Sequence, residues 1–247
     1  MKAMILAAGL GARLRPLTDD RPKALAAVAG RTLLEITLTR LRSFGIREVI
    51  INVHHFADMI LDYLNENNYF GMRIEISRED VLLDTGGGLK KAAWFFLEGS
   101  QPSGGPCLLH NVDVISTIDL GRMVQFHTEN GALATLAVQK RETSRCLLFD
   151  EGLQLCGRAG GEQKTELVRS IARMEALAFS GIHVVSPRLF AMMREEGVFS
   201  IITSYLRLAA QEERIMAFRA DQYYWRDVGR PADLVQAAQD LEQKLLL

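Results

Sequence analysis

Short apolar runs alternate with amphipathic stretches through the first half of the chain. The apolar or β-branched runs, which are typical of strands, lie at 2–7, 47–53, 72–77 and 107–114. The stretches that place apolar residues at helical spacing lie at 32–45, 57–68 and 88–98. This alternation predicts βαβ units and a parallel sheet with helices on its faces.

The second half of the chain has a more mixed pattern. Strand-like runs or strand exits lie at 131–140, 175–186, 214–220 and 223–229, and helical spacing returns at 187–197, 200–212 and 231–247. Two polar stretches, 99–106 and 159–170, predict a surface loop and a mobile flap. Because there is no internal repeat or long linker, we expect residues 1–247 to form one domain. Its predicted fold is a Rossmann-like three-layer α/β/α architecture with a mixed, mostly parallel central sheet.

Composition and charge exclude several classes of function. With 29 Lys and Arg against 30 Asp and Glu, the chain lacks the basic excess of a nucleic-acid-binding protein. No apolar run is long enough to span a membrane, and the first residues lack the pattern of a signal peptide. Cys107, Cys146 and Cys156 have no zinc-type spacing. We therefore expect a reduced, cytoplasmic protein with neither a nucleic-acid nor a membrane partner.

The loop after the first predicted strand carries the candidate chemistry. Residues 7–25 read AAGLGARLRPLTDDRPKAL, and glycines in such a loop let backbone N–H groups approach a phosphate. The loop is not a dinucleotide-binding fingerprint, because Leu14 stands where the third glycine belongs, and it does not match the Walker pattern. It instead supplies the cations Arg13, Arg15 and Lys23, which suit a triphosphate whose charge shifts during a reaction.

This loop resembles the signature of a known enzyme family. The pattern G-x-G-x-R-L-x-P-L-T followed by P-K is similar to the signature loop of the sugar-1-phosphate nucleotidyltransferases. Four further segments of the chain also resemble segments of that family. They are LLDTGGGLKKA (82–92), HNVDV (110–114), AFSGIHVVSP (178–187) and WRDVGRPADL (225–234). The chain resembles the short members, such as the N-acetylmuramate and mannose 1-phosphate nucleotidyltransferases, which lack the C-terminal β-helix of longer relatives.

The resemblance implies a fold and a reaction. The fold is of the nucleotide-diphospho-sugar transferase type. The reaction joins a nucleoside triphosphate to a sugar 1-phosphate and gives a nucleotide sugar and pyrophosphate, by in-line attack on the α-phosphate. Because both reactants are anionic, catalysis is mostly positioning and charge neutralisation. The cofactor implied is Mg²⁺, with Asp113 and Asp227 as metal ligands, and the catalytic residues implied are Arg13, Lys23 and Asp113.

The resemblance also implies two groups of binding residues. The nucleotide-binding candidates are Ala7, Ala8, Gly9, Leu10, Gly11, Ala12, Arg13, Gly86, Gly87, Gly88 and Asn111. The candidates for the sugar phosphate are Lys23, Asn111, Glu175, Ser180 and Gly181. By contrast, His54 and His55 make a poor chelate, because adjacent strand residues point to opposite faces, and His110 is expected to be a packed strand histidine.

The chain departs from the family pattern at two places. Val112 stands where relatives often have glycine before the first metal-binding aspartate. The Glu-Lys-Pro segment of longer relatives is missing, and Arg141, Arg145 or Lys164 are the candidates to replace its lysine.

Two other functions stay open at this stage. One is a cytidylyltransferase for phosphocholine or another alcohol phosphate, for which Tyr223 and Tyr224 are candidate contacts to a cation. The other is a non-catalytic module that binds a nucleotide sugar. The nucleobase, the sugar and the oligomeric state do not follow from the sequence.

Overall fold

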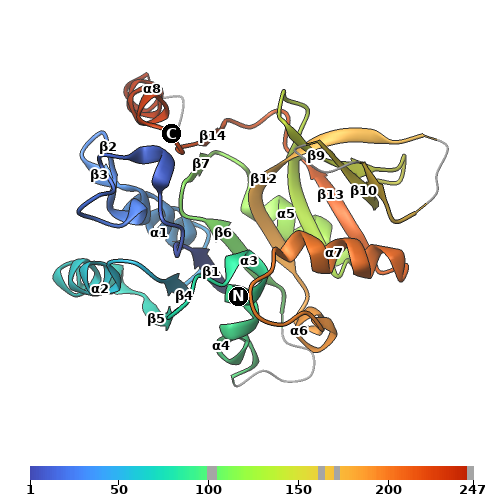
Figure 1. Ribbon diagram of the computed structural model, residues 1–247, viewed down its shortest axis with the longest axis horizontal. Helices are drawn as coiled ribbons and strands as arrows, with labels where there is room; N and C mark the ends of the chain where they lie inside the picture. Colours follow the sequence, from blue (N-terminus) through green and yellow to red (C-terminus); the bar gives the residue numbers. More distant parts are fainter. Residues whose placement is uncertain (99–104, 161–164, 170–172, 244–247) are drawn as a thin grey trace.

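A central sheet of ten strands organises the protein, and helices cover both of its faces (Figure 1). The computed structural model describes residues 1–98, 105–160, 165–169 and 173–243. The strands of this sheet are β1 (Lys2–Leu6), β4 (Glu48–Val53), β5 (Arg73–Arg78), β6 (Cys107–Asn111), β8 (Ala134–Gln139), β9 (Arg145–Phe149), β10 (Leu155–Gly160), β11 (Glu166–Leu167), β12 (Glu175–Val185) and β13 (Ile215–Arg219).

The N-terminal part of the sheet is parallel. Its strand order is β6–β1–β4–β5, and all neighbouring strands run in the same direction. Strand β4 is buried from Val49 to Val53 without alternation, as expected for a parallel strand that is covered on both faces. The carboxyl ends of β1, β4 and β6 therefore meet at one edge of the sheet, where open α/β sheets bind their ligands.

Strand β12 marks the change to antiparallel pairing. It spans eleven residues and pairs antiparallel with β6, β8 and β9. Beyond it, β9, β10 and β11 form an antiparallel extension, while β13 pairs in parallel with β8. The prediction of a mixed, mostly parallel central sheet is confirmed, with the antiparallel pairs gathered from β12 onward.

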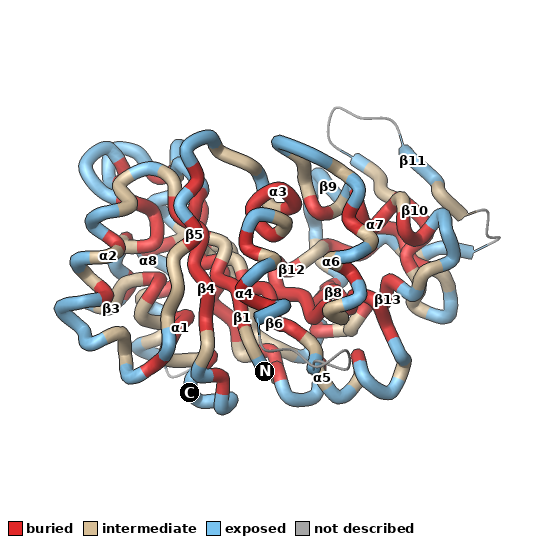
Figure 2. Tube along the Cα trace, turned by 90° about the horizontal axis from the view of Figure 1, so that it is seen from below, coloured by how far each residue is buried: buried red, intermediate tan, exposed pale blue. Residues whose placement is uncertain are grey.

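Two hydrophobic clusters, one on each face of the sheet, create the three layers. Successive side chains of β1 point to opposite faces of the sheet, so Ile5 belongs to one cluster and Met4 to the other. The helices on the Ile5 face are α1 (Leu33–Ser43), α2 (Ala57–Glu66), α5 (Leu120–Glu129) and α8 (Pro231–Glu242). Those on the Met4 face are α3 (Asp84–Lys91), α4 (Ala93–Leu97), α6 (Arg188–Met192) and α7 (Ile201–Ala210). Figure 2 shows the central strands as a mostly buried band between the two helical layers.

Two small strand pairs lie outside the main sheet. Strands β2 (Ala27–Val28) and β3 (Arg31–Thr32) form a short hairpin, and β7 (Val114–Ser116) pairs antiparallel with β14 (Trp225–Asp227). The β7–β14 pair joins segments more than a hundred residues apart in the sequence, and α8 follows it (Figure 1). Three short 3-10 turns, η1 (Ala12–Leu14), η2 (Lys23–Leu25) and η3 (Asn68–Gly71), complete the described elements.

The structure corrects several predicted element boundaries. The helix predicted at 88–98 begins earlier, at Asp84, and divides into α3 and α4. The strand predicted at 107–114 ends at Asn111, before the turn that carries Asp113, and resumes as β7. The sequence analysis missed α5, β9 and β10.

Some predicted segments lie partly outside the described residues. These are the loop at 99–106, the flap at 159–170 and the end of the helix at 231–247. Within the described part of the chain, the longest helix has 12 residues, and no helix is long and apolar enough to cross a bilayer.

Candidate active site

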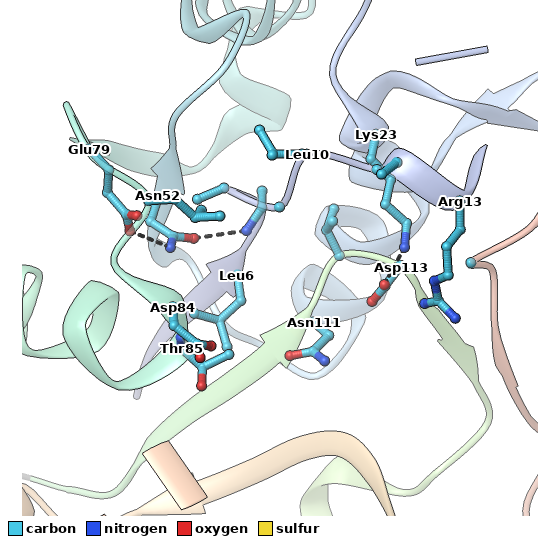
Figure 3. A pocket seen from close by; sticks show the side chains of 18 of the residues that line it. Leu6, Leu10, Arg13, Lys23, Asn52, Glu79, Asp84, Thr85, Asn111 and Asp113 are labelled. Atoms are coloured by element: carbon cyan, nitrogen blue, oxygen red, sulfur yellow. Dashed lines mark hydrogen bonds and ion pairs between the residues drawn. The ribbon is translucent and has the colours of Figure 1, made fainter. Parts of the chain in front are cut away.

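A cavity of about 550 Å³ opens at the carboxyl edge of the parallel strands. The first part of the predicted phosphate loop lines it, through Ala7, Ala8, Gly9, Leu10, Gly11, Ala12 and Arg13. Lys23, Asn111 and Asp113, predicted from distant parts of the sequence, line the same cavity (Figure 3). We call this space the loop cavity.

The phosphate loop is held in shape by its own backbone and by Thr18. Gly11 has a φ of +65°, which favours glycine, and its carbonyl accepts hydrogen bonds from the Thr18 hydroxyl at 2.9 Å and the Leu14 amide at 2.8 Å. The Leu14 side chain is fully buried. The residue that replaces the third glycine of a dinucleotide fingerprint therefore anchors the loop to the core.

Lys23 and Asp113 form an ion pair at the bottom of the loop cavity. Lys23 begins the turn η2 directly after Pro22, and its side chain is 10% exposed. Its ammonium group donates a hydrogen bond to Asp113 Oδ2. By contrast, Arg15 pairs with Asp19 at 3.2 Å, and both side chains are mostly exposed. Arg15 therefore does not join the site.

The β7–β14 pair brings the two predicted metal ligands together. Asp227 pairs with Val114 in the ladder, and the amide of Val228 donates to the carbonyl of Asp113 at 2.8 Å. Arg13 approaches from the phosphate loop, with Nη2 3.6 Å from Asp227 Oδ2. The two aspartates and the two cations thus lie in one cluster, as the sequence analysis expected.

Gly229 provides the space that Arg13 occupies. A Cβ atom at this position would lie 2.7 Å from Arg13 Nη2 and 3.1 Å from Asp227 Oδ1. The backbone of the segment after β14 therefore forms the wall against which the guanidinium rests.

The carboxyl group of Asp227 is not fully satisfied by the protein. Its Oδ1 atom is buried and has no hydrogen-bond partner in the described structure. Burial, and then the negative charge of Asp113, raise the pKa of Asp227 above its ordinary value, while Lys23 and Arg13 oppose the shift. An unsatisfied carboxylate beside a second one fits a divalent cation.

The donor set fits Mg²⁺ better than a metal held wholly by protein. The described residues hold no group of three or more His, Cys, Asp and Glu side chains suited to a metal. Mg²⁺ characteristically takes one or two carboxylates and completes its shell with phosphate oxygens and water. Asp113 and Asp227 provide two carboxylates next to the loop cavity.

Asn52 and Glu79 form a buried pair that the sequence analysis missed. Asn52 Oδ1 accepts from the amide of Ala7 at 2.8 Å, and its Nδ2 donates to Glu79 Oε1 at 2.7 Å. The other oxygen of Glu79 accepts from the amide of Leu83 at 2.9 Å. The pair ties the start of the phosphate loop to the start of α3. Only the strand-end positions of the two residues could have signalled this role.

The three glycines at 86–88 have a packing role that the sequence analysis did not foresee. All three are buried, and Asp84 and Thr85 line the loop cavity instead of them. Side chains at Gly86 and Gly87 would collide with Phe199 and with the carbonyl of Gly197. A Cβ at Gly88 would lie 2.7 Å from Glu79 Oε1. The glycines therefore allow α3 to pack closely against the segment before α7 and against the buried pair.

A second cavity of about 820 Å³ adjoins the loop cavity. We call it the acceptor cavity. The two cavities share four residues, Asp84, Thr85, Asn111 and Asp113, and the second is also lined by Asp227, Trp225 and Gly181. Gly181 has a φ of +72°, and a Cβ there would lie 2.8 Å from Asn111 Nδ2. The glycine thus leaves room for the Asn111 amide at the junction.

Two predicted sugar-phosphate residues lie elsewhere. Ser180 is fully buried and its carbonyl accepts from Trp225 Nε1 at 2.7 Å, so it supports the wall without lining either cavity. Glu175 lies at the start of β12, outside both cavity linings, and pairs with Arg219. The described geometry therefore favours Asn111 and Gly181 over Ser180 and Glu175 as ligand contacts.

Three arginines line the acceptor cavity: Arg141, Arg145 and Arg158. Arg141 lies 3.7 Å from the centroid of the Trp225 ring and donates to the carbonyl of Phe179 at 2.7 Å. Its Nε is buried without a partner among the described residues. Lys164, the third candidate to replace the missing lysine, lies outside the described residues. The sequence analysis did not single out Arg158.

The histidines take up structural positions. His54 Nδ1 hydrogen bonds with the carbonyl of Glu79 at 2.7 Å, and the His55 ring lies 3.9 Å from the Phe56 ring. His110 is fully buried in β6, with Nδ1 2.8 Å from the carbonyl of Asn111.

The fold and the site together define an α/β protein with a cavity of paired cations and carboxylates at the carboxyl edge of its parallel strands. A family model described as "Nucleotidyl transferase" matches residues 2–146, more than half of the chain. The chain belongs to this nucleotidyl transferase family.

Two known proteins illustrate the relationship. The chain is 34% identical over 234 residues to N-acetylmuramate alpha-1-phosphate uridylyltransferase from Caulobacter vibrioides. The match covers 93% of this chain and 92% of that protein. It is 29% identical over 236 residues to mannose-1-phosphate guanyltransferase beta-B from Xenopus laevis. That match covers 95% of this chain but 63% of the relative.

Solved structures have the same fold. HddC from Yersinia pseudotuberculosis, complexed with GMP-PN, matches with a TM-score of 0.75 at 20% identity over 97% of this chain and 99% of that one. UDP-glucose pyrophosphorylase complexed with UDP-glucose matches with a TM-score of 0.74 at 18% identity over 98% of each chain.

Proposed function

We propose that this protein is a Mg²⁺-dependent nucleotidyltransferase that joins a nucleoside triphosphate to a sugar 1-phosphate and releases pyrophosphate. The observation that carries the proposal is the junction of two cavities at the cluster of Arg13, Lys23, Asp113 and Asp227. Such a junction is where two anionic substrates would meet for an in-line displacement.

The loop cavity suits the triphosphate. Backbone amides of residues 8–13 would approach the phosphates, and Arg13 would hold the oxygens that become pyrophosphate with its planar fork of donors. Lys23 is positioned to stabilise negative charge on the reacting phosphates. The Asn52–Glu79 pair keeps the loop in register with the entrance of α3.

Asp113 and Asp227 are the side chains that would hold Mg²⁺. When bound, Mg²⁺ supplies charge neutralisation at the phosphate oxygens. Asp113 lines both cavities and Asp227 lines the acceptor cavity, so the two carboxylates would lie where the two substrates meet.

The acceptor cavity suits the sugar 1-phosphate. We assign to Arg141 the charge that the missing Glu-Lys-Pro lysine supplies in longer relatives. Two observations support this assignment. The Arg141 guanidinium stacks on Trp225, which lies on the same strand as Asp227. The Nε of Arg141 is buried without a hydrogen-bond partner among the described residues. Arg145 also lines the cavity, from the start of β9.

Arg145 and Arg158 favour an acceptor that carries a second anionic group. In the β9–β10 ladder, Arg145 pairs with Gly160, and Leu147 pairs with Arg158. Arg145 and Arg158 are therefore diagonal neighbours on the same face of the sheet. Arg158 pairs with Glu166 at 2.7 Å, whereas Arg145 has no ion pair within the described residues. The Caulobacter vibrioides relative acts on the phosphate of a sugar acid, N-acetylmuramate. We propose a carboxylate-bearing sugar 1-phosphate as the acceptor.

The structural context argues against a cationic acceptor such as phosphocholine. The Trp225 ring is already covered by the Arg141 guanidinium, which repels a second cation. The Tyr224 hydroxyl donates to Asp240 of α8. A purely binding module is disfavoured because both cations and both aspartates of the reaction are in place. The three free cysteines agree with a reaction in the reduced cytoplasm.

Pyrophosphate release tests the reaction. Purified protein is incubated with each common nucleoside triphosphate and a panel of sugar 1-phosphates in Mg²⁺, with and without a chelator. We expect release with at least one pair and its loss in the chelator. Triphosphate binding without pyrophosphate release from any pair would instead favour the binding module.

Matched acceptors test the acidic substrate. Glucuronate 1-phosphate has a carboxylate where glucose 1-phosphate has a hydroxymethyl group. N-acetylmuramate 1-phosphate differs from N-acetylglucosamine 1-phosphate by a lactyl ether that carries a carboxylate. We expect about tenfold or higher kcat/KM for the acid in one pair, and Arg145→Gln should remove this preference. Arg122→Gln, an exposed charge on α5, is the matched control. Higher kcat/KM for the neutral sugar in both pairs would contradict the proposal.

A further inference from the structure

Lys23 and the predicted metal compete for the same carboxylate. In the ligand-free protein the Lys23 ammonium contacts Asp113 Oδ2, and the pair is largely enclosed, with the lysine side chain 10% exposed and the aspartate side chain 23% exposed. A divalent cation at Asp113 would lie within a few ångströms of this ammonium, at a distance where like charges repel strongly.

Asp227 is in a different state. Among the described residues its Oδ1 has no hydrogen-bond partner, and its nearest cation is Arg13, which lies 3.6 Å from Oδ2 on a side chain that is 60% exposed. One of the two carboxylates is therefore available, while the protein's own cation occupies the other. The two-carboxylate site is incomplete until Lys23 moves.

A triphosphate provides the alternative partner that Lys23 requires. Both Lys23 and the phosphate loop line the loop cavity, and the four-carbon stem of lysine lets its ammonium turn toward a new anion. A phosphate oxygen forms a charge-assisted hydrogen bond similar to the one that Asp113 gives up. Movement of Lys23 to the nucleotide would thus release Asp113 without leaving the ammonium unpaired.

We infer that Lys23 acts as an internal placeholder cation, which blocks the metal site in the nucleotide-free protein and opens it when a triphosphate binds. This inference rests on the metal site and the triphosphate site of the proposed function. By linkage, nucleotide and metal then strengthen each other's binding by the same factor. Free divalent metal binds weakly by itself, and the complete centre forms only when a substrate is present.

Mn²⁺ binding to the nucleotide-free protein tests the inference without any turnover. Free Mn²⁺ is measured by electron paramagnetic resonance during titration of wild type, Lys23→Gln, Lys23→Arg and Arg141→Gln. We expect Lys23→Gln to bind Mn²⁺ at least tenfold more tightly than wild type. Lys23→Arg keeps the cation and should bind Mn²⁺ as weakly as wild type.

Arg141→Gln is the matched charge control. It removes one positive charge that interacts with Asp227 but leaves the Lys23–Asp113 contact in place. If Lys23→Gln and Arg141→Gln strengthen Mn²⁺ binding equally, the effect is general electrostatics and the inference is wrong. If Lys23→Gln is unstable, a larger rise of its melting temperature with Mn²⁺ than in wild type supports the inference, and an equal rise overturns it.

The result separates this inference from the proposed function. Mg²⁺-dependent pyrophosphate release by a wild type that binds Mn²⁺ tightly without nucleotide would overturn the placeholder role alone. Tight Mn²⁺ binding by Lys23→Gln in a protein that turns over no sugar phosphate would overturn the reaction but keep the placeholder. No Mn²⁺ binding to any variant would overturn the placeholder, and chelator-insensitive turnover would then remove the metal from the proposed function as well.

Discussion

At the scale of single residues, the site is built from two ion pairs, Arg13 with Asp227 and Lys23 with Asp113. Arg13 and Lys23 come from the N-terminal loop, Asp113 follows the middle strand β6, and Asp227 ends β14. Each cation faces one carboxylate, so the charges balance before any substrate arrives. In the proposed function, a substrate phosphate would take the place of the aspartates beside the two cations, and a divalent ion would take the place of the cations beside the two aspartates.

Replacing Asp113 with Asn tests the value of one carboxylate. We expect turnover to fall by roughly two to four orders of magnitude, because a proposed metal ligand is lost while the side-chain shape is kept. The measurement is kcat beside the circular dichroism spectrum. Wild-type turnover in a folded Asp113→Asn protein would remove this residue from the metal site.

Gly229→Ala tests whether the position of Arg13 matters. The added methyl group would lie 2.7 Å from Arg13 Nη2, and the flexible side chain can swing away at little cost in stability. We therefore expect kcat to fall about tenfold with a nearly unchanged melting temperature. Gly105→Ala, where a Cβ would meet nothing within 4 Å, is the control. Equal kcat values for the two variants would show that Arg13 does not act from this position.

At the scale of elements, the close approach of α3 to the segment before α7 sets the shape of both cavities. The amides of Gly86 and Gly87 donate hydrogen bonds to the Phe199 carbonyl of this segment, at 2.9 Å and 3.2 Å. Thr85 Oγ1 also accepts from the amide of Ile201 at the start of α7.

Gly87→Ala should separate these elements. The new Cβ would collide with the Gly197 carbonyl, and backbone atoms cannot move aside as a side chain can. We expect a loss of about 1–3 kcal/mol in the free energy of unfolding, measured by urea denaturation, with Gly105→Ala as the matched control. A stability equal to that of the control would mean that α3 has room to shift.

The glycine-rich helix shows what sequence reasoning can and cannot reach at this scale. The pattern GGG marks a close approach but not its partner, so the sequence analysis assigned it to the nucleotide although a neighbouring segment occupies the space. The hairpin of β9 and β10 was missed because its strands carry Arg145 and Arg158 among apolar residues, which weakens the alternation. The periodic helices α1, α2 and α7 were found within a few residues.

At the scale of the whole molecule, three buried histidines link stability to pH. Burial lowers the pKa of His110 and His127 to about 4 and that of His183 to about 3. In the unfolded chain the same groups titrate near 6.5. Between these values the unfolded state binds more protons, so the free energy of unfolding falls as the pH is lowered.

His127→Gln isolates one of these groups. His127 Nδ1 lies 2.9 Å from Thr135 Oγ1, and glutamine can keep a hydrogen bond there. We expect the slope of unfolding free energy against pH to decrease by up to about 1.4 kcal/mol per pH unit between roughly pH 4.5 and 6. The measurement is urea denaturation at several pH values. An unchanged slope would mean that His127 titrates normally in the folded protein.

The sequence predicted the parallel strands, both cations and both aspartates, because each belongs to a local motif. It could not predict which side chains share a wall of the acceptor cavity, because β9, β10 and β12 contribute to that wall from segments whose pairing is set by the folded sheet. Arg158 in the acceptor cavity and Glu79 in the loop cavity were missed for this reason.

The pairing of β7 with β14 has a consequence for the order in which the protein is made. Asp227 follows Asp113 by 114 positions, a stretch that a ribosome needs about 6–23 s to add at typical speeds. During that interval the nascent chain already carries Arg13, Lys23 and Asp113 but lacks Asp227. The pairing of β7 with β14, which brings the two aspartates together, can therefore form only near the end of synthesis.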